Sequence, residues 1–431
     1  MIPIRSRRAL LLFCSLAIPI LSTGQTEGLR VGVAKADITP ARPCMLGGYA
    51  SRTNLSTGVH DPLSARATVF EHDGRRLALV SVDILGFYNE TAEPLRNAIV
   101  DACGLQPAQL MLAAIHTHAA PIPVLAAGKF HPNNVDYTKT LKDRLVKVTK
   151  DAIDGLRPAR IGIGVGASPV GVNRRERATD KNGQPLIRLG RNPPGITDHD
   201  VQVLQVRERD TDQIAATLFA YATHGTSLGG KNLVVSGDVL GLAEQFVEKY
   251  LGNGIVGPAF AGASGDIDPW FRVLPEIKTA DNWIPEPVLL GTFLGEEAIH
   301  TSEGIRDFSP NGPVASLLKT IQLPAKADPQ NPGQTNSPPL PFAITAARVG
   351  DVALVGLGGE VFNEIGRAIK DLSPFPRTII ITHCNGAAGY LVPARAYPEG
   401  GYEVKTTHFS PEASDAVIKE VASLLRQLKN E

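Results

Sequence analysis

The sequence predicts an α/β fold in which mixed β-sheets are surrounded by helices. Strand and helix patterns alternate irregularly along the 431 residues, which argues against a doubly wound parallel sheet. Two hairpin signals lie among them, Asp73-Gly74 and Gly350-Asp351, each flanked by two apolar runs. The sequence has no internal repeat. We therefore expect a mixed-sheet α/β core.

In the first half of the chain, apolar alternation indicates strands and 3.6-residue spacing indicates helices. The longest helical pattern places Leu141, Leu145 and Val148 on one face. In chain order we expect a strand over residues 29–38, a hairpin over 65–71 and 76–85, a helix over 90–103, a strand over 109–115 and a helix over 135–156.

The second half continues the irregular alternation. In chain order we expect strands over residues 159–166, 201–207 and 214–223, a helix over 237–251, a strand over 255–261, a hairpin over 342–348 and 352–357, a strand over 378–382 and a helix over 411–428. The stretch 325–341, rich in Pro, Asn and Gln, is typical of a surface loop.

The first residues have the features of a removable leader. A cluster of arginines precedes an apolar run over residues 9–21 that is too short to span a bilayer, and Ser22-Thr23-Gly24 supplies small residues for cleavage. We expect a signal peptide over residues 1–24, a mature chain over residues 25–431, and export to the periplasm or the medium.

Composition narrows the class of protein. Forty-three Lys and Arg balance forty-three Asp and Glu, so no excess charge points to a nucleic-acid partner. No later segment is long and apolar enough for a transmembrane helix. Outside the leader, Cys44, Cys103 and Cys384 are too few and too widely spaced for a disulfide framework or a cysteine zinc site. One bridge stays open, and the sequence does not choose its pair. The oligomeric state is not indicated.

Polar side chains stand where three expected strands end. His116 and His118 follow one apolar strand, His224 follows another, and Glu360 follows a third through a glycine-rich segment. Such strand ends are a usual place for an active site in an α/β fold. A lone histidine there is more often an ordinary core or surface residue. Two histidine sites and a carboxylate together match the nitrogen and oxygen ligands that zinc prefers, with one position left for water.

A set of motifs in fixed order runs through nearly all of the expected mature chain. They are residues 31–40 (VGVAKADITP), 45–49 (MLGGY), 64–67 (SARA), 116–121 (HTHAAP), His224 and Gly359-Glu360. In this order they resemble the N-terminal catalytic domain of the neutral/alkaline non-lysosomal ceramidase family. The resemblance implies that domain's fold and one bound zinc ion, Zn2+.

The resemblance also implies roles for single residues. His116, His224 and Glu360 match three zinc ligands of the family. Residues 390–403 align without gaps with a tyrosine-rich segment, and in that register Tyr397 completes the zinc shell. Asn173-Arg174 resembles a pair whose arginine lines the active site.

Two departures from the family bear on the substrate. The segment 265–270 (GDIDPW) places Asp268 where the family has its active-site serine. A carboxylate beside the metal would repel an anionic substrate edge. The chain also ends soon after its last expected helix, so we expect the ceramidase catalytic domain without the family's immunoglobulin-like C-terminal domain. Long-chain ceramide is therefore not the expected substrate.

Together these features predict a zinc-dependent hydrolase that cleaves an amide (N-acyl) bond by a metal-activated water. Its expected substrate is a small-molecule or lipid-like acyl compound. Asp268 is the expected general base, while His118, Arg174 and Tyr397 are expected to stabilise the oxyanion. For Asp266 a structural role in tying a loop is expected.

Several alternatives remain beside this interpretation. Asp268 could instead close the metal shell or cap a turn, and Tyr397 could be an ordinary core aromatic. The substrate could be an ester, a lactone or a glycan. The chain could also be a catalytically silent binding protein braced by its metal. His118 and Arg174 favour the enzyme, because a structural metal has no need of polar groups aimed at an open position.

Overall fold

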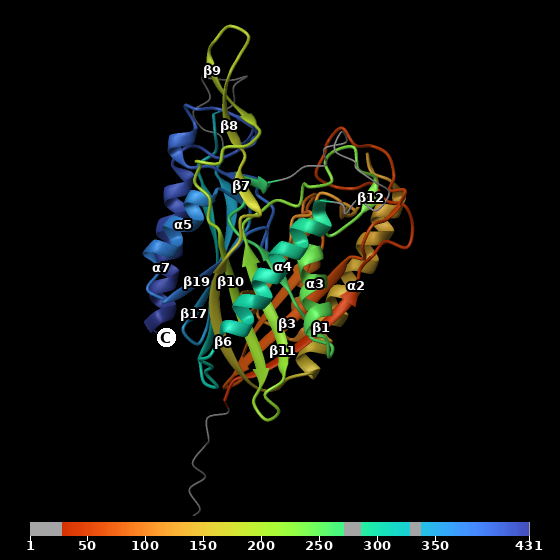
Figure 1. Cartoon of the computed structure of the whole chain (residues 1–431), viewed down its shortest axis with the longest axis vertical. Coiled ribbons are helices and arrows are strands. Elements are labelled where there is room, and N and C mark those ends of the chain that lie inside the picture. The colour runs from red at the N-terminus through yellow and green to blue at the C-terminus, as the bar shows by residue number, and fades with distance from the viewer. Residues whose placement is uncertain (1–27, 271–285, 328–337, 431) are drawn as a thin grey trace, which may run out of the picture.

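The computed structural model describes residues 28–270, 286–327 and 338–430. Within these residues the chain forms four layers, with two β-sheets stacked between two outer layers of helices (Figure 1). The signal peptide expected over residues 1–24 lies outside the described residues, as does most of the loop expected over 325–341.

The larger sheet has eight strands. Its order is β13 (Ala259–Ala261), β11 (Ile214–Tyr221), β10 (Asp200–Glu208), β6 (Arg157–Ala167), β1 (Arg30–Asp37), β3 (Ser64–His72), β4 (Arg75–Val82) and β5 (Leu110–Ala114). The pairs β11–β13 and β4–β5 are parallel and the remaining neighbours are antiparallel. The prediction of mixed sheets is therefore confirmed.

The smaller sheet has four strands. Its order is β15 (Val314–Leu323), β16 (Leu340–Val349), β17 (Val352–Leu357) and β19 (Arg377–Ile381), with β17 and β19 parallel. Phe70 and Met111 of the larger sheet share a core with Ala347 and Leu354 of the smaller one. The larger sheet is covered on both faces. The residues of its strand β3 are therefore nearly all buried and do not alternate between buried and exposed.

Four further pairs of short strands complete the sheets. They are β2 (Gly58–Val59) with β12 (Val234–Val235), β7 (Gly171–Asn173) with β14 (Ile267–Pro269), β8 (Arg175–Thr179) with β9 (Pro185–Leu189), and β18 (Glu360–Val361) with β20 (Tyr390–Leu391). The β8–β9 hairpin projects from one end of the molecule (Figure 1).

Helices cover the outer face of each sheet. Over the larger sheet lie α1 (Ala92–Cys103), α2 (Pro132–Asp154), α3 (Asp238–Leu251) and α4 (Glu286–Gly304), and over the smaller one α5 (Asn363–Leu372) and α7 (Ala413–Asn430). Three shorter helices are η1 (Pro107–Gln109), η3 (Ala394–Ala396) and α6 (Tyr402–Thr406). No helix of the described residues has the length and apolar character needed to cross a membrane.

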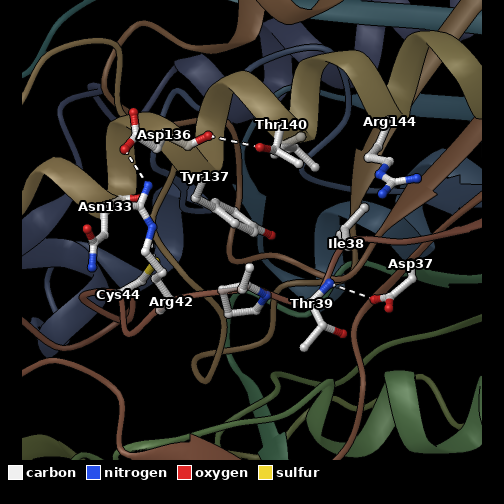
Figure 2. A pocket seen from close by; sticks show the side chains of 13 residues that line it. Asp37, Ile38, Thr39, Arg42, Cys44, Asn133, Asp136, Tyr137, Thr140 and Arg144 are labelled. Atoms are coloured by element: carbon white, nitrogen blue, oxygen red, sulfur yellow. Dashed lines mark hydrogen bonds and ion pairs between the residues drawn. The ribbon is translucent and has the colours of Figure 1, made fainter.

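A small hollow of about 180 Å³ lies where the end of β1 meets α2 (Figure 2). Tyr137 lines it, and the hydroxyl of this buried residue has no hydrogen-bond partner among the described residues. Arg42 and Asp136 form an exposed ion pair at 2.6 Å on its rim. Because no residue of the expected zinc site lines it, this hollow is separate from the predicted chemistry.

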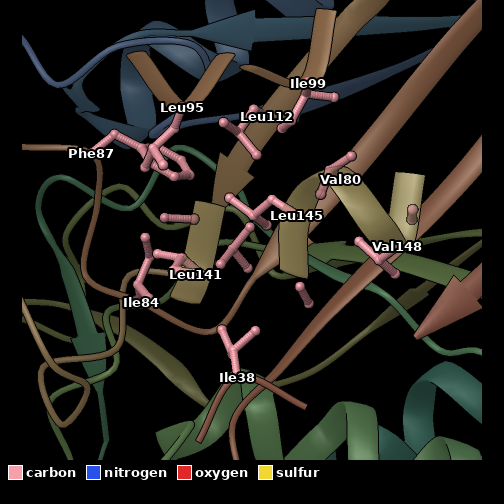
Figure 3. Close-up of a cluster of buried hydrophobic side chains, with 14 of the residues drawn as sticks. Ile38, Val80, Ile84, Phe87, Leu95, Ile99, Leu112, Leu141, Leu145 and Val148 are labelled. Carbon is pink, nitrogen blue, oxygen red and sulfur yellow. The ribbon is translucent and has the colours of Figure 1, made fainter. Parts of the chain in front are cut away.

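The buried face of α2 is the one predicted from its spacing. Leu141, Leu145 and Val148 pack in one core with Val80 of β4 and Leu112 of β5 (Figure 3). Each such side chain contributes about 1.5–3 kcal/mol when fully buried. This packing holds β5, the strand that leads to His116, from its outer face.

Local signals predicted both hairpins correctly. Asp73 and Gly74 have φ of 49° and 75°, as a two-residue turn between twisted strands requires. The hairpin around Gly350 pairs β16 with β17. The helices expected over 90–103, 135–156, 237–251 and 411–428 are present within a few residues. The strand expected over 255–261 is shorter and is β13.

Other elements had no expectation in the sequence. Helix α4 packs on α3 and on the larger sheet, but its outer face also carries the apolar residues Leu289 and Phe293, which are exposed, so its sequence has no clear amphipathic period. Glycines in β6 let α4 lie close to this strand. A Cβ atom at Gly166 would lie 2.0 Å from the Glu297 side chain of α4. Cys44, Cys103 and Cys384 are all free, so none of them forms the disulfide left open above.

Candidate active site

Strands from both sheets end at one place. β5 and β11 of the larger sheet lead to His116 and His224, and β17 of the smaller sheet leads to Glu360. A parallel bridge between Thr117 and Gly225 joins the segments that follow the first two strands. The three strand ends singled out in the sequence therefore meet in space.

Backbone carbonyls fix the rings of two of these histidines. Nδ1 of His116 donates to the Leu85 carbonyl at 2.7 Å, and Nδ1 of His224 donates to the Ile267 carbonyl at 3.0 Å. A carbonyl oxygen can only accept, so each Nδ1 carries a proton and each Nε2 is left to face the other residues of the site. Both side chains are buried. Metal-binding histidines are commonly oriented in this way.

The carboxylate of Glu360 faces Nε2 of both histidines. Its Oε2 lies 3.5 Å from Nε2 of His116 and 3.4 Å from Nε2 of His224, and this oxygen has no hydrogen-bond partner in the described residues. Its Oε1 accepts a hydrogen bond from Tyr88 at 2.8 Å. Burial works to raise the pKa of Glu360, but the facing histidines outweigh it and hold the pKa well below its usual range.

The spacing of these atoms fits a metal ion. Nε2 of His118 lies 3.3 Å from Nε2 of His116, and His116, His118 and His224 offer nitrogens within 4.8 Å of one another. Four ligands in a tetrahedron about 2.0–2.1 Å from zinc are about 3.3–3.4 Å apart. The observed separations of 3.3–3.5 Å match that figure. The residues therefore fit a metal, with His118 as a further candidate ligand.

His118 has fewer side-chain hydrogen bonds than His116 and His224. Burial, together with repulsion from His116 and His224, lowers its pKa well below the ordinary value. Its Nδ1 is buried and has no partner among the described residues. The ring packs edge-on to Tyr49, with centroids 5.1 Å apart, and against Gly48, where a Cβ would lie 2.3 Å from Nδ1. The loop that carries Gly48 therefore holds His118 in place.

Arg174 connects the cluster to three neighbours. It donates to Glu403 at 2.8 Å, to the Tyr390 hydroxyl at 3.0 Å and to Asp268 at 3.2 Å, and its Nη1 lies 3.2 Å from Nε2 of His224. Burial would lower the pKa of Arg174, but Tyr390 and the two carboxylates raise it well above the usual value. Arg174 is therefore a fixed cation next to the predicted site.

Asp268 lies behind this arginine. Its carboxylate is buried, pairs with Arg174 at 3.2 Å and lies 3.7 Å from Arg191. Neither Asp268 nor Arg174 is among the residues that line the cavity leading to the cluster. Asp268 is thus close to the cluster, and Arg174 contacts both Asp268 and His224.

Tyr397 is the one predicted residue that the structure does not bring to the cluster. Its hydroxyl donates to the Phe409 carbonyl at 2.7 Å, and its ring packs on the core beside α7. Tyr390 stands there in its place, because β20 pairs with β18 and sets Tyr390 directly opposite Glu360. The register taken from the tyrosine-rich segment chose the wrong tyrosine for this position.

Two more residues at the site were missed. The buried ring of His383 stacks on His116 with centroids 3.8 Å apart, and its Nε2 has no partner among the described residues. His383 follows the apolar strand β19, so the reasoning used for His116 and His224 would have found it. Tyr88 lies in the loop after β4, where no local pattern marked it.

Asp266 has the structural role expected of it. Its oxygens accept from the backbone amide of Asn363 and from the Asn173 side chain, both at 2.8 Å. Burial raises its pKa to about 6. The residue therefore ties the loop after β13 to the start of α5.

A cavity of about 520 Å³ opens onto the cluster. His116, His118 and Glu360 lie on its wall, together with Tyr88 and Tyr390. The remaining wall is partly apolar and partly basic, with Leu46, Leu85, Ile122, Phe130, Arg52 and Lys129. A volume of this size suits a small-molecule ligand, for which cavities of about 300–1,000 Å³ are common.

Comparison with known proteins gives a consistent result. The model of one family, described as neutral/alkaline non-lysosomal ceramidase, N-terminal, matches residues 29–269. A neutral ceramidase of Mycobacterium tuberculosis is 29% identical over 241 residues, which are 52% of this chain and 36% of that protein. One from Oryza sativa subsp. japonica is 25% identical over 269 residues, 60% of this chain and 34% of the relative. The matched part is thus about a third of the length of these relatives.

Solved structures support the fold. The crystal structure of neutral ceramidase from Pseudomonas aeruginosa superposes with a TM-score of 0.76 at 19% identity, covering 94% of this chain and 75% of that one. A structure titled as ceramidase complexed with C2 gives 0.77 at 18% identity with the same coverage. At this identity the likeness shows the fold and leaves the activity to be argued from the site.

Proposed function

This chain belongs to the neutral/alkaline non-lysosomal ceramidase family, and we propose that it is a zinc-dependent hydrolase that cleaves an amide (N-acyl) bond. One observation carries the proposal. Two imidazole Nε2 atoms and a carboxylate oxygen converge at 3.4–3.5 Å in a buried place, while the Nδ1 atoms of both rings are taken up by backbone carbonyls. A metal ion bound between these three atoms would be coordinated by all of them at once.

His116, His224 and Glu360 would hold the metal, with His118 at or next to the fourth position. Zinc, when bound, lowers the pKa of a coordinated water to roughly 7 and polarises a carbonyl oxygen. Histidine nitrogens and a carboxylate oxygen are a donor set that suits zinc. The metal's identity is part of the proposal.

The chain's own residues orient this centre and the substrate. Tyr88 fixes Oε1 of Glu360, and Tyr390 is held by Arg174 beside the same carboxylate. His118 lies on the cavity wall, where its ring can hydrogen-bond to a substrate carbonyl oxygen as that oxygen gains charge. The oxygen of a water molecule bonds to the carbonyl carbon and the carbon–nitrogen bond breaks; the leaving amine takes the protons of that water, and the acyl half leaves as a carboxylate.

For Asp268 the geometry favours positioning over direct proton transfer. It pairs with Arg174, which in turn contacts His224 and Tyr390. A carboxylate that faces an arginine stays ionised and keeps that arginine in place. We propose that Asp268 acts through Arg174 and does not touch the substrate. A general-base role predicts instead that Asp268→Asn removes nearly all activity.

The cavity favours an enzyme over a metal-braced binding protein. A structural zinc is normally closed off by its ligands, whereas here about 520 Å³ of space leads to the histidines. That volume also favours a smaller acyl compound over long-chain ceramide, whose two chains need an extended apolar lining because each buried methylene contributes only about 0.8 kcal/mol. Esters, lactones and glycans are the alternative substrates.

The test is hydrolysis by the zinc-loaded protein. Short N-acyl amides, fluorescent long-chain ceramide and matched esters would be compared before and after treatment with a chelator. We expect release of amine from the short amides, little from ceramide, and loss of activity in the chelated protein and in His224→Ala. Equal activity with and without the metal would refute the proposal. Faster cleavage of esters than of amides would mean that the substrate is an ester.

We also propose that the protein is exported after cleavage near Gly24. The proposal rests on the arginine-flanked apolar run over residues 9–21. N-terminal sequencing of the protein purified from its native source should begin near Gln25. A chain that keeps Met1 would contradict export by this leader.

A further inference from the structure

The cavity that leads to the cluster is positively charged. Away from the histidines, its wall carries two cations, Arg52 and Lys129. Glu360 is the one carboxylate among the described residues of the wall, and it faces His116 and His224. With a divalent metal bound there, Glu360 offsets only part of the metal's charge, so the two basic side chains remain unbalanced.

Arg52 is the more informative of the two. Its side chain is 7% exposed, yet no carboxylate of the described residues lies within ion-pair distance. Its Nη atoms donate to three backbone carbonyls, those of Gly47, His118 and Asn232, while its buried Nε has no partner in the described chain. Burial lowers the pKa of this guanidinium.

A purely structural role does not fully explain this residue. The carbonyl contacts hold the loop over Gly47 to the backbone of His118, and neutral donors would serve that purpose as well. A buried charge without a counter-ion is costly, and arginine is well suited to binding a carboxylate through its planar guanidinium. The guanidinium lies 5.1 Å from the ring centroid of Tyr49, but no described carboxylate balances its charge, and Arg52 lines the cavity. An anionic ligand in the cavity would supply the missing counter-ion.

Lys129 adds a second cation to the same wall. It is exposed to solvent at the edge of the cavity, its ammonium lies 5.2 Å from the ring centroid of Phe130, and no described carboxylate pairs with it. Lysine and arginine therefore line one cavity together with apolar residues such as Leu46, Leu85 and Ile122. An amphiphile with one negative group and one apolar chain complements this lining.

The position of Arg52 restricts where the negative group lies on the substrate. Arg52 donates to the carbonyl of His118, whose ring is part of the histidine cluster. The anion must therefore be close to the bond that is cut. An α-carboxylate on the amine half of the amide, two bonds from the amide nitrogen, meets this requirement, whereas an anion at the far end of the acyl chain does not.

We propose that Arg52 and Lys129 form a carboxylate-binding subsite and that the substrate class is the N-acyl amino acid. This inference rests on the proposed amide hydrolysis and names its substrate. A carboxylate at Asp268 was expected to repel an anionic substrate, but Arg174 and Arg191 lie 3.2 and 3.7 Å from it, so its charge is offset.

The test compares matched amides on the zinc-loaded protein. N-octanoylglycine carries the carboxylate, N-octanoylglycinamide lacks the charge, and N-octanoyl-phosphoethanolamine carries a phosphate instead. We expect kcat/KM for N-octanoylglycine to exceed that for the neutral amide by at least about tenfold, because a hydrogen bond to a charged group contributes about 1.5–3 kcal/mol. Equal values, or a preference for the phosphate, would overturn the inference while leaving amide hydrolysis intact.

Variants locate the effect. The ratio of kcat/KM for N-octanoylglycine to kcat/KM for the neutral amide should fall about five- to tenfold in Lys129→Gln. Lys147→Gln removes the same charge from the exposed surface of α2, where Lys147 pairs with Asp151, and should leave the ratio unchanged. The same loss of ratio in both variants would mean a general charge effect and would also overturn the subsite.

A direct binding measurement separates this inference from the proposed function. If no amide is hydrolysed, the proposed function fails, and calorimetric titration with N-octanoylglycine and its neutral amide still tests the subsite. We expect tighter binding of the carboxylate, weakened by Lys129→Gln and by higher salt. Binding of the two compounds with equal affinity would refute the subsite independently of catalysis.

Discussion

Two clusters of buried charged side chains in this chain differ in how completely their atoms are paired. In the first, Arg66 of β3 donates to Glu244 at 2.5 Å and to Glu248 at 2.7 Å, and it lies 3.3 Å from Asp83. Glu244 also accepts from the backbone amide of Ala259 at 2.6 Å. In this Arg66 cluster no buried side-chain nitrogen or oxygen lacks a partner within the described residues.

The histidine cluster is not complete in this way. Oε2 of Glu360, Nδ1 of His118 and Nε2 of His383 are buried and have no hydrogen-bond partner in the described chain. Most members of both clusters are buried, so burial of the residues alone does not distinguish them. A cluster whose buried polar atoms are all paired is explained by the fold alone. A cluster with unpaired buried polar atoms indicates that a further component binds there.

The largest expected effect on stability lies in the Arg66 cluster. Arg66→Met leaves three carboxylates without their cation and should lower the free energy of unfolding by about 3–5 kcal/mol, as removal of one partner from a buried ion pair does. Urea denaturation followed by circular dichroism measures it. Arg76→Met, which breaks a partly exposed pair with Glu71, should lower it by under about 1 kcal/mol. Similar losses in the two variants would contradict the structural role of the Arg66 cluster.

Asp238 is a buried carboxylate that accepts hydrogen bonds from uncharged backbone amides. It accepts from Ser227, Leu228 and Val239, and burial raises its pKa from 3.8 to about 6. The folded chain therefore holds this proton more tightly than the unfolded chain. Ionisation of Asp238 destabilises the fold above pH 6, and the effect disappears as the pH falls to about 4.

Asp238→Asn removes the charge and keeps an acceptor. The free energy of unfolding of the variant minus that of the wild type should be higher at pH 8 than at pH 4 by up to about 3 kcal/mol, from a shift of about two pKa units. Denaturation curves of both proteins at the two pH values measure this difference. A difference that does not change with pH would show that Asp238 is not a source of strain.

Metal binding at the histidine cluster should stabilise the folded protein by a smaller amount, which depends on the free zinc concentration. At a free zinc concentration one hundred times the dissociation constant, the free energy of unfolding should rise by about 2.7 kcal/mol. Thermal unfolding with zinc and with a chelator measures this change, and His116→Ala should show none of it. Equal shifts in the wild type and in His116→Ala would place the metal elsewhere.

The smallest effect distinguishes two tyrosines. Tyr390→Phe removes a hydroxyl that accepts from Arg174 beside Glu360 and should lower kcat/KM about tenfold. Tyr397→Phe loses only a bond to the Phe409 carbonyl and should leave kcat/KM within about twofold. The reverse order would restore Tyr397 as the residue at the metal.

Local patterns in the sequence were sufficient for much of the fold. The hairpin at Asp73-Gly74 and the apolar face of α2 depend on neighbouring residues, so they could be predicted without knowledge of the rest of the chain. Helix α4 could not, because the exposed apolar residues Leu289 and Phe293 on its outer face blur the amphipathic period. The order of strands in the two sheets depends on long-range packing that no local pattern carries.

The site divides in the same way. His116, His224 and Glu360 were predicted because each follows an apolar strand, and strand ends gather at one edge of a sheet. The choice between Tyr390 and Tyr397 depended on a register that the sequence did not determine, and the pairing of β18 with β20 decides it. Arg66 was noticed as part of a motif, but its carboxylate partners come from distant segments and only the fold brings them together.

The most direct test of the central claim is the zinc content of the purified protein. Elemental analysis of the wild type, of His224→Ala and of Arg66→Met compares the two clusters in one measurement. We predict about one zinc per chain in the wild type and in folded Arg66→Met, and none in His224→Ala. Wild-type protein that holds no metal, even after zinc is added and the excess removed, would contradict the claim that the histidine cluster is a metal site.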